Sequence, residues 1–274
     1  MDLNAESLVG YLRAEYAASG KWRIFSFLIG LIVALPAVVS IVTTDAKTLY
    51  YLAALNIFLL TIWLAVNHNY NRKKNAAHAA RRAALIVNGL GEELSAGEKR
   101  RLSDKFTVTT EQAQKAQKSD YYATKAVPGP SRLLESLEES AFYSSKLHAS
   151  SANAWIGIVI VYAFSFTALA IFVIPSATND YLMMSVRIFF AATVFVLSAD
   201  VLGSLMAHRR CARETGEILS RIEISKSGSI NTADAIHILE DYTSAIQGAP
   251  EILPLIYRKQ EADLNRLWDA YRNG

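Results

Sequence analysis

The chain has 274 residues, 52% of them hydrophobic, and 28 Lys and Arg against 25 Asp and Glu give it a formal net charge of +3. The hydrophobic share exceeds that of ordinary soluble domains, and so small a charge does not indicate a nucleic-acid polymer as partner. The single cysteine, Cys211, excludes an intramolecular disulfide framework.

Four apolar stretches lie along the chain, at 25–43, 49–67, 155–174 and within 181–206. Each is long enough, at 1.5 Å per helical residue, to cross a hydrocarbon core roughly 30 Å thick. The first three contain no charged residue, whereas the fourth contains Arg187 and Asp200. We therefore predict four transmembrane helices.

The four stretches form two pairs, because only the link 44–48 separates the first two, and only Pro175 and the link 176–180 separate the last two. Links this short predict antiparallel helical hairpins. The predicted fold is an all-α membrane protein with two transmembrane hairpins and a cytoplasmic helical bundle. Its expected parts are a cytoplasmic N-terminal segment, hairpin 1, a cytoplasmic helical segment, hairpin 2 and a cytoplasmic C-terminal segment, at 1–24, 25–67, 68–154, 155–206 and 207–274.

Basic residues outside the stretches predict the orientation. The two short links contain only Lys47, whereas basic clusters flank the stretches on the other side, at 13–23, 72–82 and 209–213. Because cytoplasmic loops are enriched in Lys and Arg, both termini and the middle segment are expected in the cytoplasm. Binding of anionic lipid by the same clusters is compatible with this orientation.

The middle segment reads as helical. Strong helix formers at 76–87 predict a helix that stops at 88–91, where two glycines occur. The run 127–130, with two prolines, predicts a break, and Ser131 can cap a new helix. Since no breaker follows before Pro175, one long helix should continue into the third span, with an apolar stripe at Leu134, Leu137 and Ala141.

The C-terminal segment predicts three further helices. The first covers 207–225, and the second begins at Asn231 or Thr232 and ends at Gly248. The apolar face of the second contains Ala235, Ile238, Leu239, Tyr242 and Ile246, and that of the last contains Leu264, Leu267, Trp268 and Tyr271. Amphipathic faces of this kind need a partner surface, and a bundle formed with the middle segment would supply it.

No enzyme motif occurs in the sequence. Zinc-protease, serine-hydrolase and phosphate-loop patterns are all missing, and the five histidines lack the spacing of a metal site. We therefore expect no catalytic residues, no metal and no cofactor.

Polar residues inside the predicted spans are the candidates for a pore or an assembly surface. Arg187 either anchors the outer interface or lines a polar pathway. Asp200 lies deeper and either pairs locally or serves a pathway or assembly, because a buried carboxylate needs a partner, water or a proton. Asn56 can join helices by hydrogen bonding, and Gly203 belongs to a ladder of small residues that permits close packing within the chain or between copies.

Three stretches, read with the two hairpins, resemble the SMODS-associating four-transmembrane effector family over nearly the whole chain. The stretches are Asp120-Tyr121-Tyr122, the run 139–155 leading into the third span, and the run 241–268 with Tyr242, Tyr257 and Trp268. Members of that family are membrane effectors encoded beside nucleotide second-messenger synthases in bacterial anti-phage signalling.

The resemblance implies an effector of the bacterial inner membrane that a cyclic oligonucleotide, made by a neighbouring nucleotidyltransferase, activates to oligomerise and permeabilise the bilayer. It directs attention to seven ligand or regulatory candidates: Asp120, Tyr121, Tyr122, Tyr143, Lys146, Tyr242 and Tyr257. These tyrosines could stack on a nucleotide, or they could simply pack between helices. The alternatives to an effector are a small transporter or channel and a non-conducting membrane scaffold.

Overall fold

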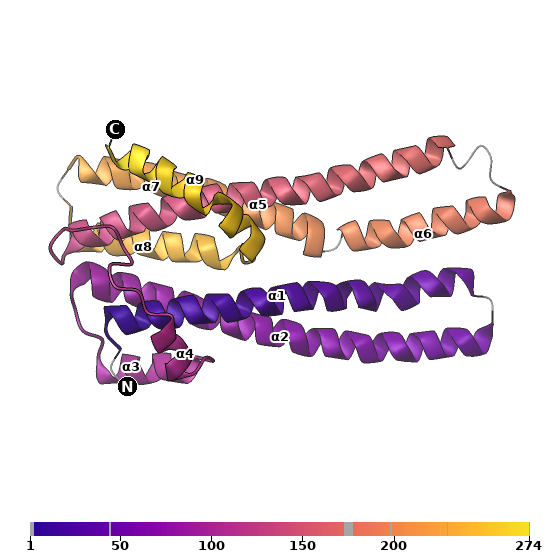
Figure 1. The fold of residues 1–274 in the computed structure, drawn as a ribbon, viewed down its shortest axis with the longest axis horizontal. Helices are drawn as coiled ribbons and strands as arrows, with labels where there is room; N and C mark the ends of the chain where they lie inside the picture. The colour runs from indigo at the N-terminus through magenta and orange to yellow at the C-terminus, as the bar shows by residue number, and fades with distance from the viewer. Residues whose placement is uncertain (1–2, 44, 173–177, 198, 229, 274) are drawn as a thin grey trace. The chain divides into compact units, whose positions relative to one another are not determined.

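The structure is a computed structural model that describes residues 3–43, 45–172, 178–197, 199–228 and 230–273. Every regular element in these ranges is a helix (Figure 1). In chain order the helices are α1 (Ala5–Val42), α2 (Ala46–Leu90), α3 (Ala96–Lys105), α4 (Thr110–Lys115), α5 (Pro130–Phe172), α6 (Asn179–Leu197), the π-helix η2 (Ala199–Gly203), α7 (Ser204–Lys226), α8 (Thr232–Gln247) and α9 (Pro254–Asn273). The expected all-helical fold is confirmed for this part of the chain.

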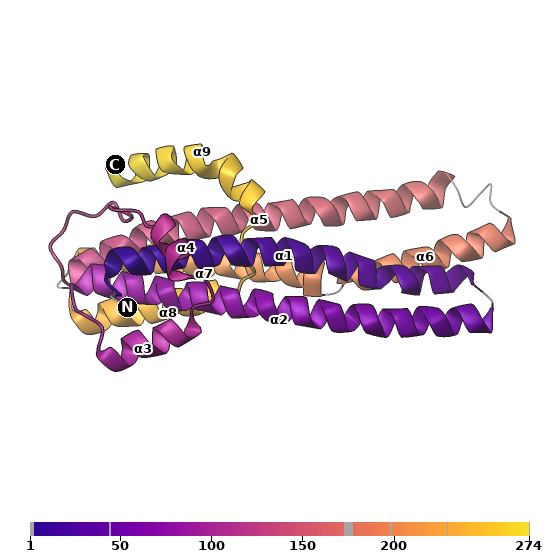
Figure 2. The same ribbon diagram turned by 60° about the horizontal axis from the view of Figure 1, so that its bottom comes forward.

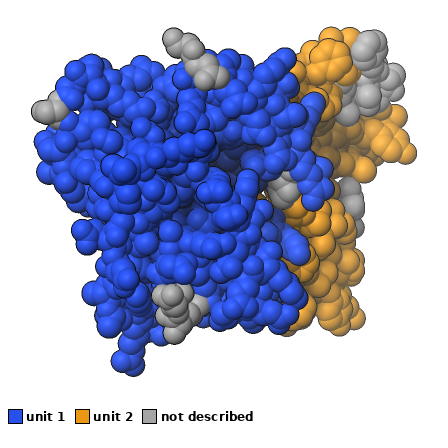
Figure 3. Space-filling model, turned by 60° about the vertical axis from the view of Figure 1, so that its left-hand side comes forward, with its two compact units in different colours: residues 1–21, 70–150, 207–274 blue, residues 22–69, 151–206 orange. Residues whose placement is uncertain are grey.

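The chain divides into two compact units, coloured separately in Figure 3. Unit 1 comprises residues 1–21, 70–150 and 207–274, and unit 2 comprises residues 22–69 and 151–206. The helices α1, α2 and α5 each contribute one part to unit 1 and the other part to unit 2. No helix break separates the two parts of any of these three helices.

Unit 2 contains all four apolar stretches, and most of the large apolar side chains that are exposed belong to it, among them Leu35, Ile57, Phe58, Val161 and Phe164. Water does not favour so much contiguous apolar surface, whereas a bilayer does. Within the described residues, α1, α2 and α5 are the helices long and apolar enough to cross a membrane.

Within unit 2, α1 and α2 run antiparallel and side by side, joined by a short connection (Figures 1 and 2). The Tyr162 and Phe189 rings, 5.8 Å apart, bring α5 and α6 together. Arg23 of α1 donates a hydrogen bond of 3.0 Å to the Ser204 hydroxyl of α7.

The fourth apolar stretch is not one α-helix. It is divided between α6, η2 and the start of α7, and Ser198 lies outside the described residues. In a π-helix each N–H bonds to the carbonyl five residues before it, so residues four apart no longer lie one above the other. Two members of the expected ladder of small residues, Ala199 and Gly203, are the ends of this π-helix, and the ladder stays a prediction.

The hydrophobic core of unit 1 is built from the inner faces of its helices. Leu134, Leu137 and Ala141 of α5 are fully buried, as their spacing predicts, and they pack with α8 residues such as Leu239 and Tyr242. The Asn231 side chain caps α8 by accepting a hydrogen bond from Asp234 N. Both predictions for these helices are confirmed.

Two details of the expected helices are wrong. Helix α5 begins at Pro130, not after a Ser131 cap, because proline suits a first turn, where its missing N–H has no intrahelical partner. On α9 only part of the predicted stripe is buried: Leu264 and Trp268 face inward, whereas Leu267 is 46% exposed. Helix α9 therefore presents a narrower apolar face than its sequence indicates.

Glu15 shows how unit 1 accommodates a buried charge. Its side chain, on α1, is fully buried. The carboxylate accepts hydrogen bonds from the Thr107 hydroxyl at 2.7 Å and the Val108 N–H at 2.9 Å, and also from the Thr107 N–H. These three hydrogen bonds replace most of those that water would supply, and they tie α1 to the segment between α3 and α4.

Helices α2 and α5 come close together at Gly89. A Cβ atom there would lie 2.8 Å from both the Cα and the Cβ of Leu133. The carbonyl of Gly89 also accepts a hydrogen bond of 2.8 Å from Gly129 N, just before α5 begins. Glycine is thus required by the contact between the two helices.

We expect Gly89→Ala to lower the free energy of unfolding by about 1–3 kcal/mol, because an added methyl forces α2 and α5 apart. Gly97→Ala is the matched control, since a Cβ at Gly97 of α3 would meet only the Ser95 hydroxyl at 4.0 Å. That substitution should stabilise by up to about 1 kcal/mol through helix propensity. Thermal melts of the detergent-solubilised variants measure both, and equal effects would contradict the close approach.

Candidate ligand-binding cavity

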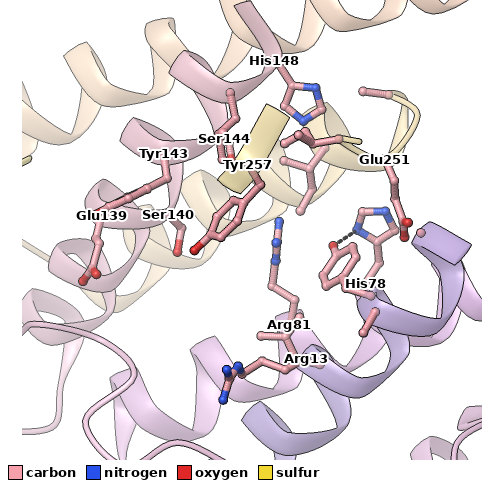
Figure 4. A pocket seen from close by; sticks show the side chains of 18 of the residues that line it. Arg13, His78, Arg81, Glu139, Ser140, Tyr143, Ser144, His148, Glu251 and Tyr257 are labelled. Atoms are coloured by element: carbon pink, nitrogen blue, oxygen red, sulfur yellow. Dashed lines mark hydrogen bonds between the residues drawn. The ribbon is translucent and has the colours of Figure 1, made fainter. Parts of the chain in front are cut away.

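Unit 1 contains a cavity of about 580 Å³ that is partly open to the surface. Its walls come from α1, α2, the segment 116–129, α5, α8 and α9. The volume lies within the range of small-molecule sites, and Figure 4 shows many of the side chains that line the cavity. Helices α1, α2 and α5, which continue into unit 2, supply three of these walls.

Arg81 of α2 reaches into this cavity (Figure 4). Its guanidinium lies 4.6 Å from the centre of the Tyr16 ring, and its Nη1 donates a hydrogen bond of 3.2 Å to the Tyr242 hydroxyl. Among the described residues, no carboxylate forms an ion pair with Arg81. The cation is held by an aromatic face and a phenol, without a negative charge.

His78 lies one turn before Arg81 on the same face of α2. Its Nδ1 is 3.1 Å from the Tyr16 hydroxyl, and its Nε2 is buried with no hydrogen-bond partner in the described part of the chain. Burial, reinforced by the charge of Arg81, lowers the pKa of His78 well below its ordinary value. The imidazole is therefore neutral at physiological pH, with one ring nitrogen available.

Tyrosines form much of the remaining wall. Tyr16, Tyr121, Tyr122, Tyr143, Tyr242 and Tyr257 all line the cavity. Burial raises the pKa of Tyr143 to about 12, and burial also raises the pKa of Tyr121 and Tyr122. Tyr121, Tyr122 and Tyr143 therefore remain neutral phenols, which can donate hydrogen bonds and stack against rings.

Three carboxylates line the cavity, and each accepts a hydrogen bond. Glu139 of α5 accepts a hydrogen bond of 2.8 Å from Ala123 N, and burial raises the pKa of its carboxyl. Glu251 accepts a hydrogen bond from the Ser19 hydroxyl. The third, Glu261 of α9, accepts a hydrogen bond of 3.5 Å from the Tyr257 hydroxyl.

Helix α9 covers part of the cavity through polar contacts. The Tyr143 hydroxyl donates to Asn265 Oδ1 at 2.7 Å, and Gln260 Nε2 donates to the Ser150 hydroxyl at 2.6 Å. Its apolar attachment is the packing of Trp268 against Phe142, with ring centres 5.3 Å apart. Helix α9 therefore supplies one wall of the cavity while it buries few of its own apolar side chains.

A second polar cluster joins α5 to α7. The Nδ1 atoms of His148 and His208 are 2.8 Å apart, and both side chains are buried. One ring must carry its proton on Nδ1 and the other on Nε2, because two protonated nitrogens cannot approach so closely. Burial, followed by the effect of His208, lowers the pKa of His148 to about 3. In the described residues no group of three or more ligands could hold a metal ion.

The structure brings together five of the seven predicted ligand candidates. Tyr121, Tyr122, Tyr143, Tyr242 and Tyr257 line the cavity. Asp120 does not line it; this exposed residue has a φ of 51°, in the left-handed region that aspartate tolerates. Lys146 is also exposed and lies over the Phe142 ring, 5.8 Å from its centre.

The pore candidates are not gathered at one place that can be described. The side chains of Arg187 and Asp200 lie outside the described residues. Gly203 ends η2. The Oδ1 atom of Asn56 is buried without a hydrogen-bond partner among the side chains that are described, so the expected hydrogen bond between helices is not seen for that atom.

Sequence reasoning missed Arg81, His78, Tyr16 and the His148–His208 contact. The segment 76–87 attracts notice for its helix formers, and its charges resemble an ordinary solvated face. One signal was present: His78 and Arg81 interrupt an otherwise alanine-rich face of α2 whose neighbours Ala77, Ala80 and Ala84 are fully buried.

No family model, curated protein or solved structure matches the chain. Function therefore has to be argued from the cavity and from the helices that surround it.

The pKa of His148 makes stability depend on pH. The unfolded chain takes up a proton near pH 6.5, whereas the folded chain does so only near pH 3. Because the unfolded state binds more protons in this window, stability falls as pH falls, by about 1.4 kcal/mol per pH unit for this residue. His148→Gln should lose less stability than the unsubstituted protein between pH 6.5 and pH 5.

Thermal melts of the solubilised protein at several pH values test this expectation. His237→Gln is the matched control, because His237 is exposed on α8 and should leave the pH dependence unchanged. Identical pH dependence of His148→Gln and the unsubstituted protein would contradict a neutral, buried His148.

Proposed function

We propose that this protein is a ligand-gated membrane effector with four transmembrane helices. Three of the spans correspond to α1, α2 and α5, which are apolar and long enough to cross a bilayer. The fourth would use α6 and the elements after it, since α5 and α6 contact each other within unit 2. The basic clusters beside unit 2 favour a cytoplasmic unit 1, with both termini on that side.

The observation that carries the proposal is the position of the cavity. Its walls include α1, α2 and α5, and each of these helices continues without interruption into unit 2. A ligand that changes the spacing of these walls acts directly on helices of both hairpins. An α-helix transmits such a displacement along its axis because its backbone hydrogen bonds are continuous.

The ligand that fits the proposal is a nucleotide second messenger, such as a cyclic oligonucleotide from a neighbouring nucleotidyltransferase. Phenol rings offer stacking faces for bases, and Arg81 offers a cation for a phosphate. The resemblance to the four-transmembrane effectors points to the same class of ligand.

The proposed output is permeabilisation of the bacterial inner membrane during anti-phage signalling. Four helices in one copy leave little room for an aqueous pore, so several copies would assemble. Asp200 and Arg187 would then supply polar groups to the pathway. A transporter or small channel would distribute polar residues through several spans, whereas charges occur in only the fourth stretch.

Cysteine labelling in whole cells tests the topology. Asp45→Cys and Asn179→Cys, both exposed at the ends of the hairpins, should react with a membrane-impermeant maleimide added outside the inner membrane. Asp120→Cys, exposed in unit 1, should react only after the membrane is opened. The native Cys211 gives little background, because burial raises the pKa of its thiol to about 12.

Labelling of position 120 from outside in intact cells would contradict a cytoplasmic unit 1. Failure to label position 179 while position 45 reacts would contradict the second hairpin.

Leakage measurements test the effector function itself. Liposomes that contain the purified protein and an entrapped dye should release the dye when a cyclic oligonucleotide that binds is added, and retain it otherwise. Leakage without any ligand would favour a constitutive channel, and binding without leakage would favour a scaffold.

A further inference from the structure

The cationic side chains of the cavity lie at two depths, one in the interior and the other at the solvent side. Arg13, Lys118 and Arg258 line it but are exposed, so their charges face water as well as the cavity. Arg81 is partly buried and lies among Tyr16, Tyr242 and His78. The cavity therefore combines one interior cation with several at its solvent side.

The interior cation is incompletely satisfied. A guanidinium has five N–H donors and keeps its proton at physiological pH, yet the one hydrogen bond described for Arg81 is that to Tyr242. The face of Tyr16 contributes a cation–π contact, which compensates only part of the desolvation. Glu15, also buried, has three hydrogen-bond donors around its carboxylate. Unit 1 thus provides three hydrogen-bond donors for the carboxylate of Glu15 but only one described hydrogen-bond acceptor for the guanidinium of Arg81.

His78 adds a second unused group at the same place. If the Tyr16 hydroxyl donates to Nδ1, the proton of the neutral ring lies on Nε2, which becomes a donor. That Nε2 is buried and has no partner in the described chain. The side chains of Arg81 and His78, one turn apart on α2, thus both have N–H donors without an acceptor. An anionic oxygen would accept hydrogen bonds from both.

We infer that Arg81 and His78 form the subsite that binds one anionic oxygen group of the ligand in the interior of the cavity, with Tyr16 as a positioning residue. The inference rests on the proposed ligand-gated function and adds which residues recognise the charge. The planar fork of arginine suits phosphate oxygens, which it can bind in pairs. The surrounding phenols favour a ligand whose phosphate is attached to ring systems.

The positions of the interior and the exposed cations also predict how the ligand is oriented. A ligand with one phosphate should place it at Arg81, and a ligand with two should place the second near the exposed cations. Contacts on the solvent side weaken as salt increases, whereas the interior contact is screened less. Added salt should therefore reduce the gain in affinity from a second phosphate more than the gain in affinity from the first.

Binding to the detergent-purified full chain tests the subsite, with adenosine, adenosine monophosphate and cyclic di-adenosine monophosphate as probes in calorimetric titrations. Adenosine has no phosphate, so its binding should be the same with and without Arg81. Arg81→Gln should weaken both phosphate-bearing probes by at least about tenfold, the loss expected for a hydrogen bond to a charged group. Arg82→Gln is the matched control, since Arg82 pairs with Glu240 and does not line the cavity.

Two further measurements guard against a variant that merely misfolds. Arg81→Lys keeps the charge but loses the fork, and its affinity should lie between those of the unsubstituted protein and Arg81→Gln. In the unsubstituted protein, a bound phosphate-bearing probe should protect Arg81 from phenylglyoxal, as measured by peptide mass spectrometry.

Equal affinity of Arg81→Gln and Arg82→Gln for the phosphate-bearing probes would overturn the inference, as would absence of binding by both of those probes. A different result would contradict the effector proposal alone. In that case the unsubstituted protein would bind a phosphate-bearing probe and Arg81→Gln would not, but the probe would release no dye from liposomes.

Discussion

The continuity of α1, α2 and α5 is the constraint on which the rest of this structure depends. Each helix must satisfy its own backbone hydrogen bonds where its side chains are apolar and exposed, because lipid offers no alternative partners. The same helices then have to pack against one another in unit 1, where small residues such as Gly89 allow close approach. The cavity of unit 1 lies between parts of these same helices.

The buried polar groups of unit 1 are of two kinds: some have hydrogen-bond partners in the chain, and others have unused hydrogen-bonding capacity. Around Glu15 the chain supplies three donors and thereby holds α1 in place. Around Arg81 and His78 it leaves hydrogen-bonding capacity unused, which lowers stability. Proteins commonly retain such unfavourable arrangements at binding sites, where the ligand completes them. The histidine pair between α5 and α7 belongs to the first kind, since the Nδ1 atoms of the two rings form a hydrogen bond with each other.

Much of the candidate site was beyond prediction from the sequence. The tyrosines at 121, 122, 143, 242 and 257 could be singled out through a family resemblance, and the structure gathers them around one cavity. Arg81 and His78 could not, because a charged residue in an alanine-rich helix reads as solvent-facing until its neighbours are known. The contacts of Arg81 are with Tyr16 and Tyr242, which are distant from it in the sequence. The exposed positions of Asp120 and Lys146 likewise follow from the packing of their neighbours.

Local chemistry by itself determined the helices: apolar runs long enough for a bilayer, glycine and proline at the breaks, and the Asn231 cap, all of which act over a few residues. Tertiary structure decided what those helices enclose. It placed the interruption at η2, left Leu267 exposed on α9 and set an unpaired cation among phenol rings. The reason is physical: helix formation depends on neighbours within four residues, whereas burial and charge compensation depend on which distant surfaces meet.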